Sequence, residues 1–469
     1  MSRVLSALTP KRVFEIFEDI CAIPHGSGNT KAISDYCVNF AKSHGLPVFQ
    51  DAHNNVIIKK PASPGYENHG AVVLQGHLDM VCEKENGCKF DFEREGLKLV
   101  TNGDFVSACG TTLGGDDGVA VAIALSILCD NSLKTPPIEA VFTTDEETGM
   151  YGAKGIDVSL LSAKRFINID SENEGVFTVG CAGGCRVEIK LPVKTETVNK
   201  PAYKVTVSGL IGGHSGTEIG KGRLNANKVL AEFLRYCGED IQISAISGGN
   251  KDNAIPTSAN CIVFSDVTEK AKEFMKKNSP GSDSGLNITA SPAKCDRAFT
   301  TDCSKQIIDL LCALPCGVRG MSEEIENLVE TSLNIGILKC NETDVFITLS
   351  LRSSKSDKLA ALKDELKTVA DRFGAQFTAH GDYPAWEYRK NSPLRDKMTA
   401  VFKSIYGKEP QIEVIHAGLE CGLFAERIKG FDAVSIGPDL FDIHTPRERM
   451  SISSVGRTYK FICKVLEEL

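Results

Sequence analysis

Histidine and acidic residues stand at several places in the sequence where an apolar segment ends or begins. They are His77 and Asp79 in LQGHLD, Asp116 in GGDDG, Glu146 and Glu147 in TDEETG, Asp170 in FINID, and His444 in DIHTP. In an open α/β sheet, functional residues gather at the carboxyl ends of the strands. Two histidines with several carboxylates form a donor set that suits Zn²⁺, Mn²⁺ or Co²⁺ and contains no thiolate. The pattern predicts a metal site.

Each of these segments has an ordinary interpretation when it is taken alone. A histidine in a loop can simply be solvated, and an aspartate before a helix is a common N-cap. The acidic run 145–147 could be a surface feature, but it follows the apolar segment IEAVFTT. Adjacent carboxylates in such a place repel one another unless cations offset the charge. The occurrence of all the segments in one chain therefore favours the metal site.

The elements that must position these residues alternate between short strands and helices. We expect helices near 10–20, 29–44 and 118–129, and strands at 55–60, 71–75, 138–144 and 165–169. This alternation predicts an α/β fold with helices on both faces of a sheet. The helix at 118–129 is apolar nearly all round, so we expect it to be buried.

The pattern changes after Cys185. Segments 186–192 and 202–208 alternate polar and apolar residues with period two, which is typical of half-buried antiparallel strands. After about Trp386 the first pattern returns. A chain of 469 residues is too long for one ordinary core. We therefore predict a discontinuous catalytic domain, residues 1–185 and 386–469, with an inserted α+β domain at 186–385 that contains an antiparallel sheet.

The composition excludes several other classes of protein. A formal net charge of −8 and the absence of a basic run argue against a nucleic-acid-binding surface. The 17 cysteines are scattered, and several stand in apolar runs, which fits free thiols in the reducing cytoplasm. We expect no signal peptide and no membrane span, because the sequence has neither a secretory leader pattern nor a long apolar stretch. A cytoplasmic protein is the expectation.

The metal motifs resemble those of the co-catalytic zinc family of aminoacylases, carboxypeptidases and dipeptidases. The resemblance covers nearly the whole chain and is greatest to the branch of aminoacyl-histidine dipeptidases, or Xaa-His and cytosol non-specific dipeptidases. Further segments that resemble this branch are GLIGGHSG at 209–216, GGNKDNAIP at 248–256, LRSS at 351–354, YPAW at 383–386 and HAGLECG at 416–422. The family resemblance implies a zinc-peptidase catalytic domain with a mixed, mainly parallel sheet flanked by helices. It also implies an inserted lid or dimerisation domain.

The resemblance also implies a ligand set for two Zn²⁺ ions per subunit, with Mn²⁺ or Co²⁺ as alternatives. Asp116 is expected to bridge the two metals. His77 and Asp170 complete one metal site, and Glu147 and His444 complete the other. At position 170 the aspartate is closer to the dipeptidase and aminopeptidase branches than to the aminoacylases and carboxypeptidases.

Catalytic and substrate-binding roles follow by the same correspondence. A metal-bridged hydroxide is implied as the nucleophile. Glu146 is the expected general base, which later gives the proton to the leaving amine. Asp79 is expected to orient His77, since a histidine ligand needs its second ring nitrogen held. Asp117 stands where relatives often carry asparagine, so it is left out of the ligand set.

Residues of the inserted domain are expected to contact the substrate. His214, in the GGHSG turn, is our candidate donor to the oxyanion. Asn253 and Arg352 are candidates for holding the substrate, and the Arg352 guanidinium suits a terminal carboxylate, although a surface salt bridge is an equal alternative. Gly418 is expected to allow close approach of the peptide. His25 and His416 have no metal-ligand role in the matched pattern.

The expected activity is hydrolysis of dipeptides, with a preference for Xaa-His, carnosine-like substrates. Alternatives within the enzymes are a broader di/tripeptidase or an aminoacylase. A metal-dependent binding or scaffold protein is the non-enzyme alternative, and the presence of Glu146 argues against it. The resemblance favours a homodimer that binds small peptides and has neither nucleic acid nor a membrane as a partner.

Overall fold

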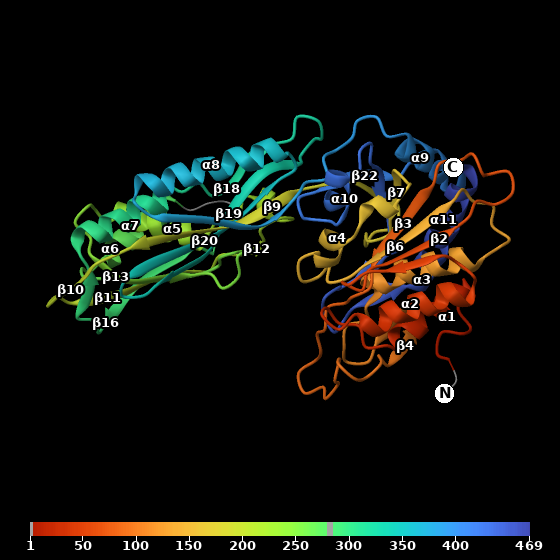
Figure 1. Cartoon of the computed structure of the whole chain (residues 1–469). Helices are drawn as coiled ribbons and strands as arrows, with labels where there is room; N and C mark the ends of the chain where they lie inside the picture. Colours follow the sequence, from red (N-terminus) through yellow and green to blue (C-terminus); the bar gives the residue numbers. More distant parts are fainter. Residues whose placement is uncertain (1–2, 279–284) are drawn as a thin grey trace. The chain divides into compact units, whose positions relative to one another are not determined.

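The computed structural model of the chain describes residues 3–278 and 285–469, which form two compact units (Figure 1). Unit 1 contains the chain up to Gly180 together with Tyr388–Val414 and Leu423–Leu469. Unit 2 contains Cys181–Glu387 and Ile415–Gly422.

Unit 2 differs from the expected insertion because it also includes Ile415–Gly422, which we had placed in the second catalytic segment. The physical reason is a backbone contact, in which the N–H of Ala182 donates to the carbonyl of Ile415 at 3.0 Å. Gly418 therefore belongs to unit 2.

Unit 1 is built on an eight-stranded sheet whose central strands are parallel. The strands, in spatial order, are β1 (Val48–Gln50), β2 (Val56–Lys60), β6 (Ile138–Thr143), β3 (Val72–His77), β7 (Arg165–Asn168), β23 (Asp432–Ser435), β8 (Val176–Cys181) and β22 (Gln411–Ile415). β6, β3, β7 and β23 pair in parallel, whereas β1 with β2, β2 with β6, and β23 with β8 pair antiparallel. The sheet is mixed, as expected.

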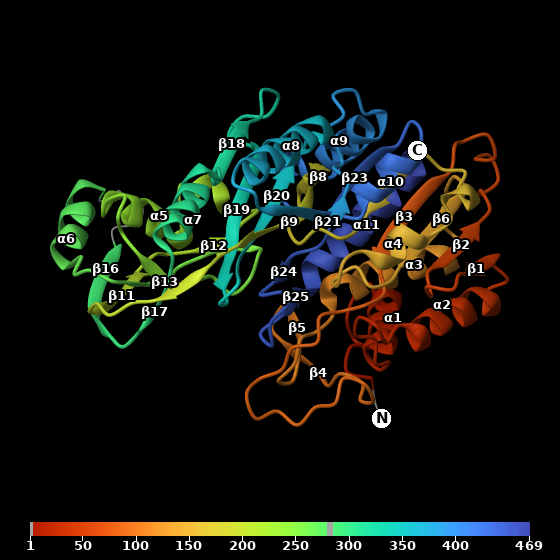
Figure 2. The same ribbon diagram turned by 60° about the vertical axis from the view of Figure 1, so that its left-hand side comes forward.

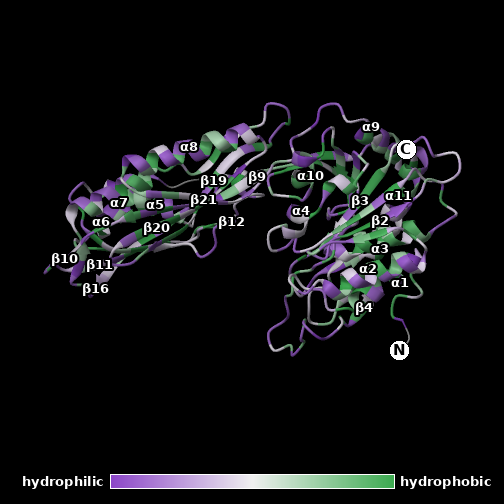
Figure 3. Cartoon of the chain, in the orientation of Figure 1, coloured by the Kyte–Doolittle hydropathy of each residue, from purple (hydrophilic) through white to green (hydrophobic). Residues whose placement is uncertain are grey.

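The central strands are buried because both of their faces are covered, which is usual for parallel strands. Every residue of β3 and β6 is buried. The helices of unit 1 are α1 (Lys11–Cys21), α2 (Lys31–Ser43), α3 (Gly115–Cys129), α4 (Tyr151–Gly155), α9 (Pro393–Tyr406), α10 (Cys421–Arg427) and α11 (Ile452–Glu468), with a 3-10 turn at Val158–Leu160. α3 packs against both β3 and α1. It is buried from Gly118 to Leu128, as its composition predicts, and it is mostly hydrophobic in Figure 3.

A small antiparallel sheet of unit 1 connects two distant parts of the sequence. Its strands, in order, are β24 (Leu440–Phe441), β25 (Arg449–Ser451), β5 (Phe105–Ala108) and β4 (Leu99–Asn102). β25 pairs with β5, so the C-terminal loop between β24 and β25 ends beside the segment that leads into α3. This pairing matters for the site described below.

Unit 2 contains a nine-stranded sheet in which every strand pair with an assigned register is antiparallel. The strands are β16 (Asn287–Ala293), β11 (Ala202–Ser208), β15 (Ala259–Val263), β13 (Ile243–Gly248), β19 (Val329–Cys340), β20 (Asp344–Ser353), β9 (Gly183–Pro192) and β21 (Gln376–Tyr383), with β18 (Gly317–Met321) paired to β19. The alternating burial of β9 shows why period two predicted this arrangement, since only one face meets the core.

Helices cover one face of the unit 2 sheet in both views (Figure 1, Figure 2). They are α5 (Ala226–Tyr236), α6 (Thr268–Lys277), α7 (Thr301–Ala313) and α8 (Ser356–Arg372). A single apolar cluster joins these helices to the sheet. The remaining elements are the strand pairs β10 (Thr195–Thr197) with β17 (Arg297–Phe299) and β12 (Gly213–His214) with β14 (Ala254–Ile255), and a 3-10 turn at Ile219–Lys221.

All 17 cysteines are free thiols, as their scattered positions predicted. Several are buried, and burial raises the pKa of Cys181 to about 11 and that of Cys185 to about 12. Such thiols pack as small apolar side chains. Among the described residues, no helix combines the length and the apolar character needed to cross a bilayer.

Gly76 allows α3 to pack closely on β3, one residue before His77. A Cβ atom at this position would lie 2.5 Å from Asp117 Oδ2 and 2.7 Å from the Ala120 methyl group. We expect Gly76→Ala to lower the free energy of unfolding by about 1–3 kcal/mol through overpacking. Chemical denaturation provides the measurement. Gly70→Ala is the matched control, since its nearest atom would be 3.6 Å away; equal stability of the two variants would contradict the prediction.

Candidate active site

The residues expected to bind metal all lie in unit 1, and three adjacent parallel strands position most of them. His77 is the last residue of β3, Glu146 and Glu147 follow β6, and Asp170 follows β7. These strands are neighbours, so their carboxyl ends meet at one edge of the sheet. Asp116 comes from the first turn of α3, and His444 comes from the loop between β24 and β25.

The Asp116 carboxylate lies between two histidines that are 367 residues apart in sequence (444 − 77). Its Oδ1 atom is 3.1 Å from Nε2 of His77, and its Oδ2 atom is 3.2 Å from Nε2 of His444. His444 Nε2 is also 2.9 Å from Glu147 Oε1, and His77 Nε2 is 3.7 Å from Asp170 Oδ1. Each oxygen of one carboxylate therefore faces a separate group of donors.

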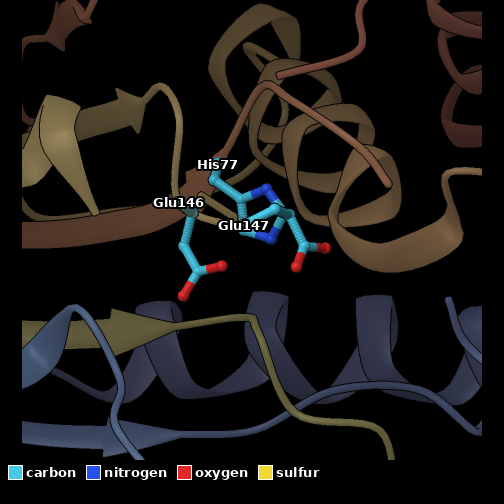
Figure 4. Close-up of side chains that lie close together, drawn as sticks. All are labelled: His77, Glu146 and Glu147. Atoms are coloured by element: carbon cyan, nitrogen blue, oxygen red, sulfur yellow. The ribbon is translucent and has the colours of Figure 1, made fainter. Parts of the chain in front are cut away.

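Among the residues that the structure describes, three groups of side chains have donor atoms close enough together to hold a metal ion. Two share Asp116 and match the ligand sets implied by the resemblance; they are His77 with Asp116 and Asp170, and Asp116 with Glu147 and His444. The third contains His77, Glu146 and Glu147. In Figure 4 the carboxyl groups of Glu146 and Glu147 extend to either side of the His77 imidazole. Glu146, expected as the base, therefore lies directly at the metal ligands.

Asp79 is buried beside His77, but its main contacts differ from those expected. His77 Nδ1 lies 2.9 Å from the backbone carbonyl oxygen of Asp79 and 3.6 Å from its carboxylate. The carboxylate instead accepts hydrogen bonds from the backbone N–H of Glu146 at 3.1 Å and of Glu147 at 3.4 Å, and from the Ser27 hydroxyl at 2.7 Å. Asp79 thus orients the imidazole through its main chain and the acidic loop through its side chain.

The loops at this edge of the sheet contain backbone conformations that residues other than glycine rarely adopt. Asp145, Asp442 and His444 all have positive φ angles, between 53° and 59°. Such conformations cost free energy and persist only where the surroundings hold them. The N–H of Gly28 donates to the Asp145 carboxylate at 2.6 Å, which provides one such constraint.

The concentration of acid at the site changes the pKa of its members. Contacts with Asp116 and Glu147 raise the pKa of His444 to about 10. Burial lowers the pKa of His77, but Asp116 and Asp79 outweigh it and hold the value well above its usual range. Burial and the nearby Asp117 raise the pKa of Asp170. An excess of buried carboxylates is stable when cations offset their repulsion, so this donor set fits metal ions.

Asp117 plays a structural part, in line with its exclusion from the ligand set. It is buried, and its Oδ2 atom accepts the backbone N–H of His77 at 3.2 Å. It therefore fixes the end of β3 against α3.

The residues expected to bind substrate all lie in unit 2. His214 and Arg352 come together around Gly216, where an added Cβ would be 3.0 Å from His214 Cε1 and 3.2 Å from Arg352 Nε. Asn253 joins the same turn through its backbone carbonyl, which accepts the N–H of Ser215 at 2.8 Å. Arg352 is only 8% exposed, which argues against the surface salt bridge. Gly418 lies within the 415–422 segment, and its role stays a prediction.

His416 belongs to this cluster, which agrees with its lack of a metal-ligand role in the matched pattern. Its Nε2 atom is 2.7 Å from the Ser332 hydroxyl, and burial, Arg352 and His214 lower its pKa to about 4. Burial and Arg352 also lower the pKa of His214. Both imidazoles are therefore neutral near pH 7 beside one guanidinium. The motif HAGLECG was visible in the sequence, but only the tertiary structure brings its histidine to Arg352.

Three buried polar atoms of this cluster have no hydrogen-bond partner among the described residues. They are Arg352 Nε, His416 Nδ1 and Ser215 Oγ. Buried polar groups without partners are rare in native proteins, so their convergence calls for a polar ligand. A guanidinium with potential donors around it favours an anion, such as a carboxylate. We call His214, Ser215, Arg352 and His416 the cationic cluster.

Removal of His444 tests the two-site arrangement, because His444 contacts only one of the two donor groups built on Asp116. We expect His444→Ala to hold about one metal ion per chain fewer than the wild-type protein. Elemental analysis after dialysis against metal-free buffer gives the content. His380→Ala serves as the control, since His380 is an exposed residue of β21. Wild-type metal content in His444→Ala would show that the loop does not contribute a ligand.

Comparisons with known proteins show the family to which the chain belongs. Residues 73–468 match peptidase family M20/M25/M40. The cytosol non-specific dipeptidase of Escherichia coli (strain K12) is 37% identical over 484 aligned positions, which cover 99% of each chain. The crystal structure of aminoacylhistidine dipeptidase from Vibrio alginolyticus superimposes with a TM-score of 0.92 and 35% identity, covering 99% of this chain and 98% of that one.

A more distant structure shares the fold. Aminopeptidase PepT from Bacillus cereus has a TM-score of 0.60 and 16% identity, with 98% of this chain and 99% of that chain covered. At this identity the likeness concerns the fold alone. The family match covers most of the sequence, and the relative from Escherichia coli spans all but 1% of it. The chain therefore belongs to peptidase family M20/M25/M40.

Proposed function

We propose that this protein is a metal-dependent dipeptidase whose catalytic centre is the donor cluster of unit 1. The observation that carries the proposal is the position of Asp116, whose two oxygens face His77 and His444 separately. This arrangement suits a carboxylate shared by two metal ions. The full-length likeness to proteins named as dipeptidases supports the same activity.

The residues that would hold the metals are assigned from the two donor groups that share Asp116. His77, Asp116 and Asp170 form one site, and Asp116, Glu147 and His444 form the other. Nitrogen and oxygen donors suit Zn²⁺, Mn²⁺ or Co²⁺, of which we propose Zn²⁺. When bound, such ions polarise the scissile carbonyl and make water acidic enough to attack it near neutral pH.

Glu146 is assigned the proton transfers. Its backbone N–H is held by the Asp79 carboxylate at 3.1 Å, and its side chain joins the donor group of His77 and Glu147. A carboxylate in this place can accept the proton of the attacking water and return it to the departing amine. Asp79 contacts both the His77 ring and the loop of Glu146, and so fixes the position of the proposed base relative to a proposed metal ligand.

The cationic cluster of unit 2 is assigned the free carboxylate of the substrate. Arg352 donates one hydrogen bond to the Tyr383 hydroxyl at 3.0 Å, and its buried Nε has no partner within the described part of the chain. A carboxylate would satisfy that atom and gain a charge-assisted hydrogen bond. His214 is proposed as a donor to the developing oxyanion, and Asn253 and Gly418 as further substrate contacts.

The preference for Xaa-His substrates is the finer part of the proposal. The two similar relatives carry different descriptions, one a non-specific dipeptidase and the other an aminoacylhistidine dipeptidase. A broader di/tripeptidase or an aminoacylase therefore stays an alternative, as does a non-catalytic metal-dependent binding protein. A homodimer in the cytoplasm is proposed from the family resemblance.

A panel of dipeptides tests the activity directly. We expect protein loaded with Zn²⁺, Mn²⁺ or Co²⁺ to hydrolyse dipeptides, including β-alanyl-histidine, and chelated protein to be inactive. Glu146→Gln should retain its metals and lose about 10²–10⁴-fold in kcat, because proton transfer is lost. Amine release measured by chromatography gives the rates, and elemental analysis gives the metal content.

N-acetylated amino acids and tripeptides in the same panel distinguish the alternatives. Faster turnover of acetylated amino acids would indicate an aminoacylase. Metal binding without hydrolysis of any member would indicate a binding protein and would refute the proposed activity.

The role of Arg352 predicts sensitivity to the charge at the substrate's C-terminus. We expect amidated dipeptides to have a KM about 10–100-fold higher than free dipeptides in the wild-type protein. In Arg352→Gln the KM of free dipeptides should rise by the same factor, so that free and amidated dipeptides have similar KM values. Steady-state kinetics provide the measurement.

Arg319→Gln is the matched control, because Arg319 is an exposed arginine of unit 2 that pairs with Glu365. Equal rates on free and amidated substrates in the wild-type protein would discard carboxylate recognition by this cluster.

A further inference from the structure

Glu448 is a buried carboxylate that the proposed chemistry does not use. Its side chain is 2% exposed and accepts hydrogen bonds from the backbone N–H groups of four consecutive residues. Oε2 accepts from Leu113 at 2.8 Å and Gly114 at 3.2 Å, and Oε1 accepts from Gly115 at 2.8 Å and Asp116 at 3.4 Å. Successive N–H groups at a helix start form a concave site for a negative charge.

The segment Leu113–Asp116 is shaped to receive this carboxylate. Gly114 has φ +67°, a left-handed conformation that glycine adopts without the cost a side chain would add. A Cβ on Gly115 would lie 3.2 Å from Glu448 Oε1, so a larger residue there would crowd the carboxylate. The glycines that precede Asp116 thus let the main chain turn its donors towards one side chain.

The other end of Glu448 belongs to the loop that carries His444. The N–H of Glu448 donates to the carbonyl of Thr445 at 3.0 Å, which closes a turn directly after His444. Arg449 pairs with Asp442 across the base of the same loop. Glu448 is therefore held in a short, closed turn whose first member follows the histidine.

The start of α3 could have been capped by a local side chain, without Glu448. A serine, threonine or aspartate at the N-cap would satisfy one or two N–H groups locally. Instead the cap comes from 332 to 335 residues away and places a further carboxyl group beside Asp116. Burying a carboxylate near like charge is costly. The contact that compensates joins the two loops that supply Asp116 and His444.

We propose that Glu448 is a positioning residue that couples the segment carrying Asp116 to the loop carrying His444 and so fixes the geometry of the metal centre. This inference rests on the proposed metal-dependent function. Both loops leave from neighbouring strands, since β25 pairs with β5, but that pairing ends at Arg449 and Ser107. Beyond that point the Glu448 carboxylate provides the link that reaches the main chain of Asp116.

Loss of this link is expected to weaken metal binding more than it lowers the stability of the fold. Side chains that hold metal ligands from behind commonly change metal affinity or activity by 10–100-fold when they are replaced. In Glu448→Gln the side chain keeps its shape, but an NH₂ group replaces one acceptor and faces two N–H donors. The segments that carry Asp116 and His444 are then no longer held together by this set of hydrogen bonds.

The test compares Glu448→Gln with Gly115→Ala and with a matched control, Glu139→Gln. Glu139 is also a buried carboxylate of unit 1 that accepts backbone N–H groups, from Ser162 and Ala163, but it lies near the start of β6. Each protein is titrated with Co²⁺, and its visible spectrum, metal Kd, kcat, KM and thermal unfolding are measured.

We expect Glu448→Gln and Gly115→Ala to weaken Co²⁺ binding by about 10–100-fold and to alter the Co²⁺ spectrum, with kcat falling more than KM changes. Glu139→Gln should lower the unfolding temperature without changing the Co²⁺ affinity or spectrum. Should Glu448→Gln fail to fold, Gly115→Ala makes the same test, because it retains the carboxylate and crowds it at 3.2 Å, with a Leu440 methyl group at 3.3 Å as the other close neighbour.

Wild-type Co²⁺ affinity, spectrum and kcat in a folded Glu448→Gln protein would overturn the inference, as would wild-type values in Gly115→Ala. Failure of the wild-type protein itself to bind Co²⁺ or to hydrolyse any dipeptide would instead refute the proposed function. The two failures are therefore distinguishable in one set of measurements.

Discussion

The sharing of the Asp116 carboxylate between two histidines is the interaction on which the site depends. It brings four carboxylates, two imidazoles and a buried strand edge into one small region. The carboxylates of such a group repel one another. Burial, and after it the charge of Asp117, raise the pKa of Asp170. Imidazoles and backbone N–H groups offset part of the repulsion, and metal ions are the natural means of offsetting the rest.

Buried parallel strands of unit 1 hold most of the histidine and acidic residues of the site in place. β3, β6 and β7 are adjacent, parallel and almost wholly buried, so the residues at their ends have little freedom. Asp79 then connects the end of β3 to the acidic loop after β6, through hydrogen bonds to Glu146 and Glu147. The small sheet of β24, β25, β5 and β4 brings the C-terminal loop to the same edge.

The cationic cluster of unit 2 differs in charge from the acidic donor groups of unit 1. One guanidinium is surrounded by imidazoles whose pKa values are lowered, so the cluster carries the single positive charge of Arg352 at neutral pH. Neutral imidazoles can still donate a hydrogen bond from one ring nitrogen. The cluster is therefore suited to bind one anionic group and to release it again. A more highly charged site would hold an anion more tightly.

The order of elements and the residues of the donor groups could be predicted from the sequence, because strand ends, turns and apolar runs are local patterns. The histidine and acidic residues that follow apolar segments, together with the family resemblance, were enough to bring together His77, Asp116, Glu147, Asp170 and His444. Only the tertiary structure decided which contacts hold them. That the Asp79 carboxylate holds the loop of Glu146 and Glu147, that His416 lies near Arg352, that 415–422 packs with unit 2 and that Glu448 reaches the start of α3 depend on contacts between residues far apart in the chain. No local pattern records such pairings, because they form only when separate strands and loops are brought to a common edge.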